Sequence, residues 1–193
     1  MSHYIAPTKT EATPEEAFAA FRLAATDLGP ESLCVLVAHW ALESGVGQRM
    51  FCWNIGGAKA TVGGGKDWTF LTTHEVENGV SVKYSAPPLD VQAGVTAESL
   101  ARMPITDPMR RRIVTTCFRA YETFQQGIDD HVGLIRKRFS PAWAHVEVPN
   151  PTLYALTLGS LRYYTAPRDQ YAQAVANHYA RFVKDAPGWR ADA

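Results

Sequence analysis

Net charge, cysteine and long apolar stretches are all scarce in this sequence. Its 193 residues include 19 basic and 19 acidic side chains, so the formal net charge is zero. This balance argues against a nucleic-acid partner, because duplex binding depends on a surplus of Lys and Arg. It also removes bulk attraction to an anionic membrane or cell wall. The longest apolar run, residues 33–42, is interrupted by His39 and is far too short to span a bilayer.

The cysteines and the start of the chain exclude further classes. Cys34, Cys52 and Cys117 cannot all pair within one chain, and none lies in a CxxC motif. We therefore expect reduced thiols that serve as small apolar side chains, without a structural zinc or redox site. Residues 1–13 are polar and contain Pro7, which is unlike a signal peptide. We expect synthesis in the cytoplasm and export by another route.

What the sequence does contain is typical of a folded domain. An apolar fraction of 46% with 20% charged residues is ordinary globular composition. The length favours a single domain over residues 1–193, with an insertion at about residues 85–111. We find no internal repeat and no low-complexity linker.

Helix signals dominate the chain. Thr13 followed by Pro14 and two acids is typical of a helix start, and Gly45 of a helix end. The helix ending there is apolar over most of its surface, so it should be central and buried. Apolar spacings of three and four predict the set of helices. These cover residues 14–28, 30–45, 110–124, 127–138, 152–163 and 166–184.

A small β lobe is expected between the second and third helices. Residues 68–76 are rich in Thr and aromatics, Asn78-Gly79 is a type I′ turn signal, and residues 80–84 return. The next stretch, residues 85–108, carries four prolines and predicts a long loop with a short helix at 97–103. The fold class is therefore α+β and mostly helical.

Glu43 is the acid that stands out. It follows eleven residues without another acid, at the end of the apolar helix, with His39 and Trp40 one turn back. A carboxyl group against Trp in a poorly solvated place should have a raised pKa, as a general acid for glycosidic cleavage requires. A surface acid at a helix end is the alternative, although a carboxylate there opposes the helix dipole.

The hairpin offers a second carboxylate. Glu75 and Glu77 are two residues apart, so they lie on the same face of the strand if the strand extends that far. Either can polarise a water or stabilise positive charge at an anomeric carbon. Solvated charges beside a turn are the alternative interpretation.

Three blocks of the chain carry a resemblance to a known family. AHWALESGVG (residues 38–47) and NIGGAKA (54–60) resemble the signature of bacterial endo-β-N-acetylglucosaminidases of glycoside hydrolase family 73. In that family a helix ends in ALESGWG and NLFGIKA follows. TTHEVENG (72–79) resembles the family's hairpin, and FRAY (118–121) with IDDHV (128–132) resembles a later block. The order of the blocks is preserved over roughly residues 33 to 140. Val46 and Gly57 depart from the pattern, where the family has Trp and Ile or Phe.

The resemblance implies a lysozyme-like domain with a small β-hairpin lobe that hydrolyses the N-acetylglucosaminyl β-1,4 bond of peptidoglycan without a cofactor. It makes Glu43 the catalytic general acid and Glu75 the second acidic residue. Tyr179, in a stretch similar to the family's Gly-Tyr-Ala, becomes a third catalytic candidate, with a core aromatic as the alternative. The expected contacts to the glycan come from the glycine-rich segment and the aromatics that flank it. These are Trp53, Asn54, Gly56, Lys59 and Trp68.

Other functions stay open at this point. A muramidase or lytic transglycosylase shares the architecture and the single Glu at the end of a buried helix. A non-catalytic peptidoglycan-binding or structural module is a further alternative. A cysteine peptidase needs a Cys near a helix start with a His partner, and nothing distinguishes the cysteines here. His39 and Glu43 lack a third metal ligand, so no metal site is expected.

The expected partners follow from the same observations. They are peptidoglycan glycan strands, with no nucleic acid and no membrane span. Because the chain has neither a basic surface nor a wall-binding repeat, we expect a carrier, delivery or immunity protein. Phage lysis, secretion and wall-remodelling systems all fit, and all bring the protein to the cell wall or periplasm. The run Arg110 to Arg112 either binds anionic wall polymers or forms the solvated face of a helix.

Overall fold

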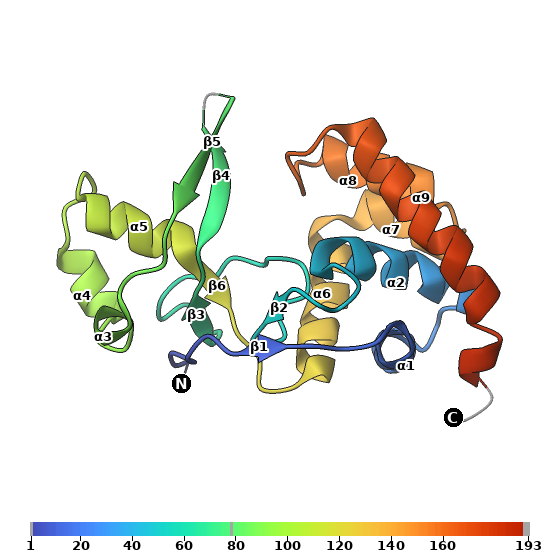
Figure 1. Cartoon of the computed structure of the whole chain (residues 1–193), viewed down its shortest axis with the longest axis horizontal. Helices are drawn as coiled ribbons and strands as arrows, with labels where there is room; N and C mark the ends of the chain where they lie inside the picture. The colour runs from blue at the N-terminus through green and yellow to red at the C-terminus, as the bar shows by residue number, and fades with distance from the viewer. Residues whose placement is uncertain (1, 78, 191–193) are drawn as a thin grey trace. The chain divides into compact units, whose positions relative to one another are not determined.

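The computed structural model of the chain describes residues 2–77 and 79–190 (Figure 1). It is about 52% helical. Residues 1–9 and 51–122 form one compact unit, and residues 10–50 and 123–193 form another. Below they are called unit 1 and unit 2. The expectation of one domain over residues 1–193 stays a prediction.

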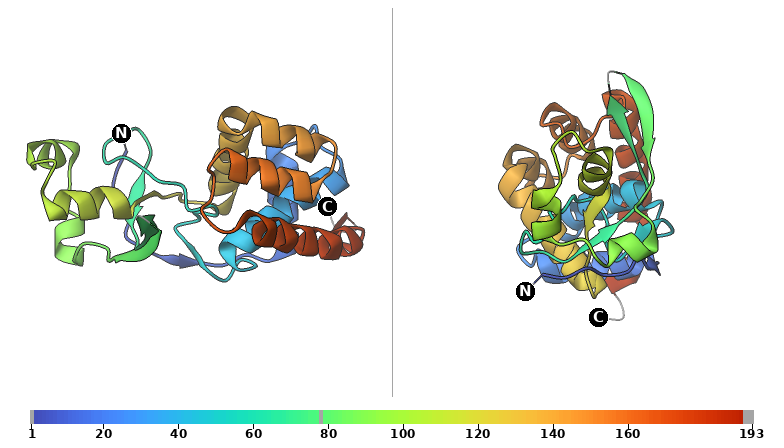
Figure 2. Two further views of the ribbon diagram at one scale, coloured as in Figure 1. Left: turned by 90° about the horizontal axis from the view of Figure 1, so that it is seen from above. Right: turned by 90° about the vertical axis from the view of Figure 1, so that its left-hand side faces the viewer.

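Unit 2 is built from helices around one buried helix, α2 (Pro30–Ser44). Every residue of α2 from Ser32 to Ala41 is buried, as its apolar sequence predicts. The long C-terminal helix α9 packs against both α2 and α8, as Figure 2 also shows. The remaining helices complete the bundle. The helices other than α2 are α1 (Pro14–Ala24), α6 (Phe124–Arg138), α7 (Ser140–Glu147), α8 (Pro151–Ser160), α9 (Arg168–Asp185) and the short 3-10 helix η1 (Gly188–Arg190).

The ends of the first two helices follow from particular residues. At the start of α1, the Thr13 hydroxyl accepts from the Glu16 amide while the Glu16 carboxylate accepts from the Thr13 amide. At the end of α2, Gly45 adopts the left-handed conformation with φ of 59°. Glycine reaches that conformation without a steric penalty, so α2 stops directly after Glu43 and Ser44.

Unit 1 holds two antiparallel strand pairs and three short helices. Strand β3 (Trp68–Phe70) pairs with β6 (Cys117–Arg119), and β4 (Thr73–Glu77) pairs with β5 (Val80–Tyr84). In the second pair Glu75 lies opposite Val82, and Glu77 lies opposite Val80. Strand β1 (Lys9–Thr10) pairs with β2 (Met50–Phe51), where the chain passes from one unit to the other. The helices are α3 (Leu89–Gln92), α4 (Ala97–Arg102) and α5 (Pro108–Thr116).

The segment expected as an insertion contributes to the core of unit 1. Val95 and Leu100 belong to the same buried cluster as Trp68, Phe70 and Ile113. The short helix expected at residues 97–103 is present as α4, with a Thr96 capping box. This part of the chain is therefore packed structure and not the long loop that its prolines predicted.

The arginine run ties α5 to its neighbours in unit 1. Arg110 donates to the Met103 carbonyl, and Arg111 pairs with Glu77 at 2.6 Å. Arg112 donates to two carbonyls of the segment after β5. These bonds give the three arginines a structural role. Neither a site for anionic polymers nor a fully solvated helix face is needed to explain them.

Several elements differ from those expected. Three helix ends are shifted by three or four residues: α1 ends at Ala24, α6 begins at Phe124 and α8 ends at Ser160. The helix predicted over residues 110–124 ends at Thr116, because residues 117–119 pair with β3 and bury Phe118 in a sheet. The strand predicted over residues 68–76 is interrupted between Phe70 and Thr73, so its halves join different partners. Helix α7 was not predicted. Asn78 of the expected turn lies outside the described residues, whereas Gly79 has the positive φ, 80°, that such a turn requires.

Candidate active site

Glu43 lies in the last turn of α2, where a largely buried helix reaches the surface. Its side chain is 23% exposed, and burial raises the pKa of its carboxyl above the ordinary value. The next residue holds the backbone that follows: the Ser44 hydroxyl donates to the Trp40 carbonyl and accepts from the Gly47 amide. Both bonds are buried, so the helix end that carries Glu43 is fixed in place.

Tyr171 of α9 is the hydrogen-bond partner of this carboxyl group. Its hydroxyl donates to Oε1 of Glu43. Burial, followed by the negative charge of Glu43, raises the pKa of Tyr171, so the phenol keeps its proton. The ring stacks on Tyr164, with centroids 3.6 Å apart and planes 11° from parallel. Donation from Tyr171 opposes burial and lowers the pKa of Glu43, but burial is the larger effect.

Behind Glu43 lies a group of aromatic and imidazole rings, of which His39, His131 and Tyr154 are buried and Tyr163 is half-buried. The ring of His39, one turn earlier on α2, contacts His131, Tyr154 and Tyr163 at centroid distances of 5.1, 5.4 and 5.0 Å. Burial lowers the pKa of His39 well below its ordinary value and that of His131 to about 4. Both imidazoles are therefore neutral at neutral pH.

Tyr179, the third catalytic candidate, lies elsewhere on α9. It is eight residues beyond Tyr171, about 12 Å along the helix axis. Its electrostatic neighbours are Glu31 and Cys34, at the other end of α2 from Glu43. The role of Tyr179 stays a prediction, and sequence reasoning missed Tyr171. A signal for Tyr171 was available only as a helically spaced aromatic, which does not separate a site residue from a core residue.

Glu75 lies on β4 in unit 1 and is held by Lys59. The ammonium nitrogen of Lys59 lies 2.7 Å from Oε1 of Glu75, donates to the Thr115 carbonyl at 2.6 Å, and lies 3.9 Å from the centre of the Phe118 ring. The Thr73 hydroxyl donates to the same carboxylate oxygen at 3.3 Å. The carboxylate is thus oriented by two donors while remaining partly exposed.

Glu77 lies on the same face of β4 and has different partners. The Tyr84 hydroxyl donates to Oε1 and the Arg111 guanidinium to Oε2, and together they lower the pKa of Glu77. Both carboxylate oxygens are therefore committed to structural bonds. Of the two hairpin carboxylates, Glu75 is the one with an oxygen that has no such partner among the described residues.

The predicted glycan-contact residues have mixed surroundings in unit 1. Asn54 is buried, and its amide group bonds the backbone of Ala58 and Arg119, which fixes the glycine-rich loop. Trp68 is 6% exposed and packs in the core cluster, which favours a packing role. Gly56 and Trp53 are half-buried, and Trp53 has a positive φ of 54°. These surroundings do not test whether any of the five residues contacts a sugar, so the five assignments stay predictions.

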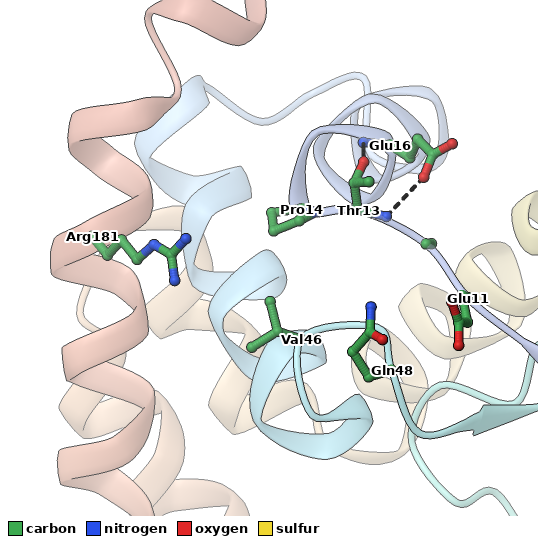
Figure 3. A pocket seen from close by; sticks show the side chains of 8 residues that line it. Glu11, Thr13, Pro14, Glu16, Val46, Gln48 and Arg181 are labelled. Atoms are coloured by element: carbon green, nitrogen blue, oxygen red, sulfur yellow. Dashed lines mark hydrogen bonds between the residues drawn. The ribbon is translucent and has the colours of Figure 1, made fainter.

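Unit 2 also has a surface pocket of about 380 Å³ (Figure 3). It lies at the start of α1, and Val46 of the loop after α2 forms part of its wall. Arg181 of α9 and Gln48 are its polar lining groups on the side away from α1 (Figure 3). Nε of Arg181 lies 3.6 Å from Oδ2 of Asp185, one turn further along α9.

Residues 2–77 and 79–190 contain no group of three or more His, Cys, Asp or Glu side chains placed to hold a metal ion. In the same residues, no helix combines the length and hydropathy needed to cross a membrane.

Comparison with known proteins identifies relatives of the fold. No protein-family model and no curated protein matches the sequence. Among solved structures, the glycoside hydrolase domain of Salmonella typhimurium FlgJ is similar with a TM-score of 0.53 and 21% identity, over 92% of each chain. A C-terminally truncated form of that domain gives 0.51 and 23%, over 87% of this chain and 93% of the other. A peptidoglycan hydrolase mutant from Sphingomonas sp. A1 gives 0.58 and 22%, over 88% and 95%.

These likenesses confirm the fold expected from the sequence. The chain has the lysozyme-like α+β fold of glycoside hydrolase domains, mostly helical with short antiparallel strand pairs. The resemblance to glycoside hydrolase family 73 thus holds at the level of the fold. Identities below 25% carry the fold alone, and activity has to be argued from the site.

Proposed function

We propose that this protein is a peptidoglycan hydrolase that cleaves the N-acetylglucosaminyl β-1,4 bond, with Glu43 as general acid. The observation that carries the proposal is a half-buried carboxyl group of raised pKa at the end of a rigid central helix. A general acid must hold its proton near neutral pH, and burial of Glu43 favours that state. The fold shared with domains described as glycoside and peptidoglycan hydrolases supports the same substrate class.

The proposed reaction begins with proton transfer from Glu43 to the glycosidic oxygen. The bond between that oxygen and the anomeric carbon breaks, and its electron pair stays with the leaving oxygen. The anomeric carbon gains oxocarbenium-like positive charge, which Glu75 or the acetamido group of the substrate stabilises. Water then adds to the anomeric carbon, and the proton that it gives up returns to the Glu43 carboxylate, which restores the acid. The chemistry uses carboxyl groups and water, and it requires neither a metal nor an organic cofactor.

We assign the other predicted site residues on the same basis. Glu75, oriented by Lys59 and Thr73, is the second acidic residue that the family resemblance implies. Trp53, Gly56 and Lys59 remain candidates for the glycan contact, alongside Asn54, Trp68 and the catalytic candidate Tyr179. In this proposal both units belong to one lysozyme-like domain.

The first prediction is that Glu43→Gln abolishes the release of reducing ends from purified peptidoglycan. Loss of a general acid lowers the rate by about 10²- to 10⁴-fold. Glutamine keeps the shape and can still accept from Tyr171, so circular dichroism and the unfolding midpoint should show a folded protein. Glu75→Gln is the comparison variant, and its effect is expected to be smaller. Retained activity in Glu43→Gln would exclude the assignment of the general acid.

Mass spectrometry of the digested peptidoglycan identifies the bond. Reducing-end N-acetylglucosamine supports the proposal, whereas reducing-end muramic acid indicates a muramidase. An anhydro-muramic acid product indicates a lytic transglycosylase. Absence of any product from folded wild-type protein indicates a binding or structural module.

We propose that a carrier or delivery partner brings the protein to the cell wall or periplasm. The zero net charge gives it no bulk attraction to an anionic wall. Phage lysis, secretion and wall-remodelling systems are the candidate routes, and an immunity protein fits the second of them.

A further inference from the structure

His39 is a buried polar side chain that the proposed reaction does not use. It is 0% exposed, and its Nε2 has no hydrogen-bond partner among the residues that the structure describes. A buried polar atom without a partner costs free energy, so its presence calls for a reason. That nitrogen lies 3.8 Å from Oε1 of Glu43, one helical turn further along α2.

The other ring nitrogen determines what Nε2 presents to Glu43. Nδ1 of His39 lies 2.8 Å from the hydroxyl of Tyr154, on α8. Burial raises the pKa of Tyr154 and lowers that of His39, so this pair is a neutral phenol and a neutral imidazole. When the phenol donates to Nδ1, the imidazole proton is on Nε2 and faces the carboxyl group. The opposite arrangement leaves the phenol hydrogen without an acceptor and turns the Nε2 lone pair toward the oxygen of Glu43.

The groups around His39 strengthen the interaction of its Nε2–H dipole with the carboxyl group of Glu43. The titratable side chains that face its ring are His131 from α6, Tyr154 from α8, Tyr163 from the segment after α8, and Tyr171 from α9. All four are neutral at neutral pH, and Glu43 is the carboxyl group beside them. In such a poorly screened environment a single N–H dipole interacts strongly with a carboxylate.

We propose that His39 is a positioning residue for Glu43. Its Nε2–H and the hydroxyl of Tyr171 are both directed at Oε1 of Glu43. Oε2 is thereby left to carry the transferable proton. Tyr171 already donates to Oε1. A movement of less than about 1 Å brings Nε2 of His39 within hydrogen-bond distance of the same oxygen. Catalytic hydrogen bonds are commonly longer before substrate binds. After proton transfer both donors stabilise the new carboxylate on the side away from the leaving group.

This inference rests on the proposed role of Glu43, but it has a readout that does not require activity. The full chain, labelled with ¹³C at the glutamate carboxyl carbons, is titrated by NMR without substrate, and the Glu43 resonance is assigned by its loss in Glu43→Gln. His39→Phe keeps a ring of similar size and removes the N–H group. We expect the Glu43 titration to move to higher pH in His39→Phe, because a donor to the carboxylate is lost.

Activity on peptidoglycan gives the second readout. In His39→Phe the descending limb of the pH profile at high pH should move in the same direction, and kcat should fall about tenfold with little change in KM. His39→Gln, which retains an N–H donor of similar reach, should restore part of the loss. The matched control is His131→Phe, a buried imidazole 5.1 Å from His39 whose Nε2 also has no partner among the described residues. It should leave the Glu43 titration unchanged.

The outcomes separate the two claims. A lower unfolding midpoint in His39→Phe with an unchanged Glu43 titration overturns the inference and leaves His39 a packing role. If His39→Phe does not fold, Tyr154→Phe keeps the packing and removes the hydroxyl that fixes the tautomer. Its Glu43 titration must then move to higher pH, and an unchanged titration overturns the inference. Full activity in Glu43→Gln, together with the expected movement in His39→Phe, rejects the proposed reaction but keeps the contact.

Discussion

Glu43 is subject to two opposing influences. Removal from water raises the pKa of its carboxyl group, and the hydrogen bond from Tyr171 lowers it, with burial the larger of the two. A general acid needs both, because burial keeps the proton in place near neutral pH and the donor stabilises the carboxylate that remains after transfer. The pH range in which the proposed enzyme works therefore depends on this balance.

Substitution of Tyr171 by Phe tests this balance. Loss of the hydroxyl removes the influence that lowers the pKa of Glu43, so that pKa rises further. Activity requires protonated Glu43, and the loss of activity at high pH should therefore move to still higher pH. We also expect kcat to fall about tenfold or more, because a hydrogen bond to a charged group is lost after proton transfer. The measurement is the pH profile of kcat/KM on peptidoglycan.

Tyr164→Phe is the control for that experiment. Tyr164 stacks on Tyr171, but its hydroxyl donates to the Ala155 carbonyl and not to Glu43. Phenylalanine keeps the stacked ring at both positions. The pH profile of Tyr164→Phe should match that of the unchanged protein. A profile like that of Tyr171→Phe would show that the pKa of Glu43 does not depend on direct donation from Tyr171.

Burial of Glu43 also carries a stability cost with a definite sign. Its pKa is higher in the folded than in the unfolded chain, so the folded state binds more protons between the two values. Stability therefore falls as pH rises through that interval and stays reduced above it. In the Glu43→Gln experiment the unfolding midpoint at neutral pH should be no lower than that of the unchanged protein, and the difference should disappear below the ordinary pKa of a glutamate.

The sequence singled out Glu43 as a candidate but gave no sign of the side chain that hydrogen-bonds to it. An isolated acid at the end of an apolar helix, followed by Gly45, is a local pattern that can be recognised without knowledge of the fold. Tyr171 lies 128 residues away, and its contact depends on how α9 packs against α2. Helical spacing alone placed Tyr171 and Tyr179 on the same helix without separating their roles. Long-range packing decides which tyrosine reaches the carboxyl group.

At the scale of elements, local signals correctly placed the start of α1 and the end of α2. The capping box at Thr13 and the left-handed Gly45 are determined by a few adjacent residues, and both are observed. The prediction that a helix continues beyond Thr116 is wrong, because a long-range contact and not a local signal decides the structure there. Residues 117–119 gain a strand partner that is remote in sequence, and this pairing overrides a helical spacing of apolar residues.

The segment after β5 shows how composition misleads about packing. Four prolines predicted a loop, yet α4 places Leu100 in the core of unit 1 with Trp68 and Phe70. We predict that Leu100→Ala lowers the free energy of unfolding by about 2–5 kcal/mol, as truncation of a packed leucine does. Denaturant unfolding at equilibrium measures the change.

Ile105→Ala is the matched control in the same segment. Ile105 is 84% exposed, whereas Leu100 is 9% exposed. A surface substitution of this kind changes stability by about 0.5 kcal/mol or less. Equal small effects at both positions would mean that the segment is an accessory loop, as its prolines first indicated.

At the scale of the whole molecule, the fold class was predictable because it depends on the pattern of apolar residues along the entire chain. The mostly helical content, the small β region and the buried central helix follow from that pattern, and the likeness to glycoside hydrolase domains confirms the class. The division into two units was not predicted. It depends on contacts between the ends of the chain and its middle, since residues 1–9 join residues 51–122.

The zero net charge is a property of the whole molecule with a measurable consequence. Without a surplus of positive charge, the chain has no general attraction to an anionic wall, and binding to it should depend on contacts to the glycan alone. We predict weak binding of the Glu43→Gln variant to purified cell walls, with little change between low salt and about 0.15 M salt, where charges are screened beyond about 8 Å. Cosedimentation measures both, since this variant should bind glycan without degrading it.

Glu98→Lys serves as the comparison. Glu98 is exposed in the first turn of α4, and its replacement raises the formal net charge by two while leaving Glu43 and Tyr171 untouched. In the Glu43→Gln background it should increase binding at low salt, and added salt should remove the increase. Tight, salt-sensitive binding of the unmodified chain would instead reveal a basic surface that the overall balance conceals. It would also remove the reason for proposing a carrier.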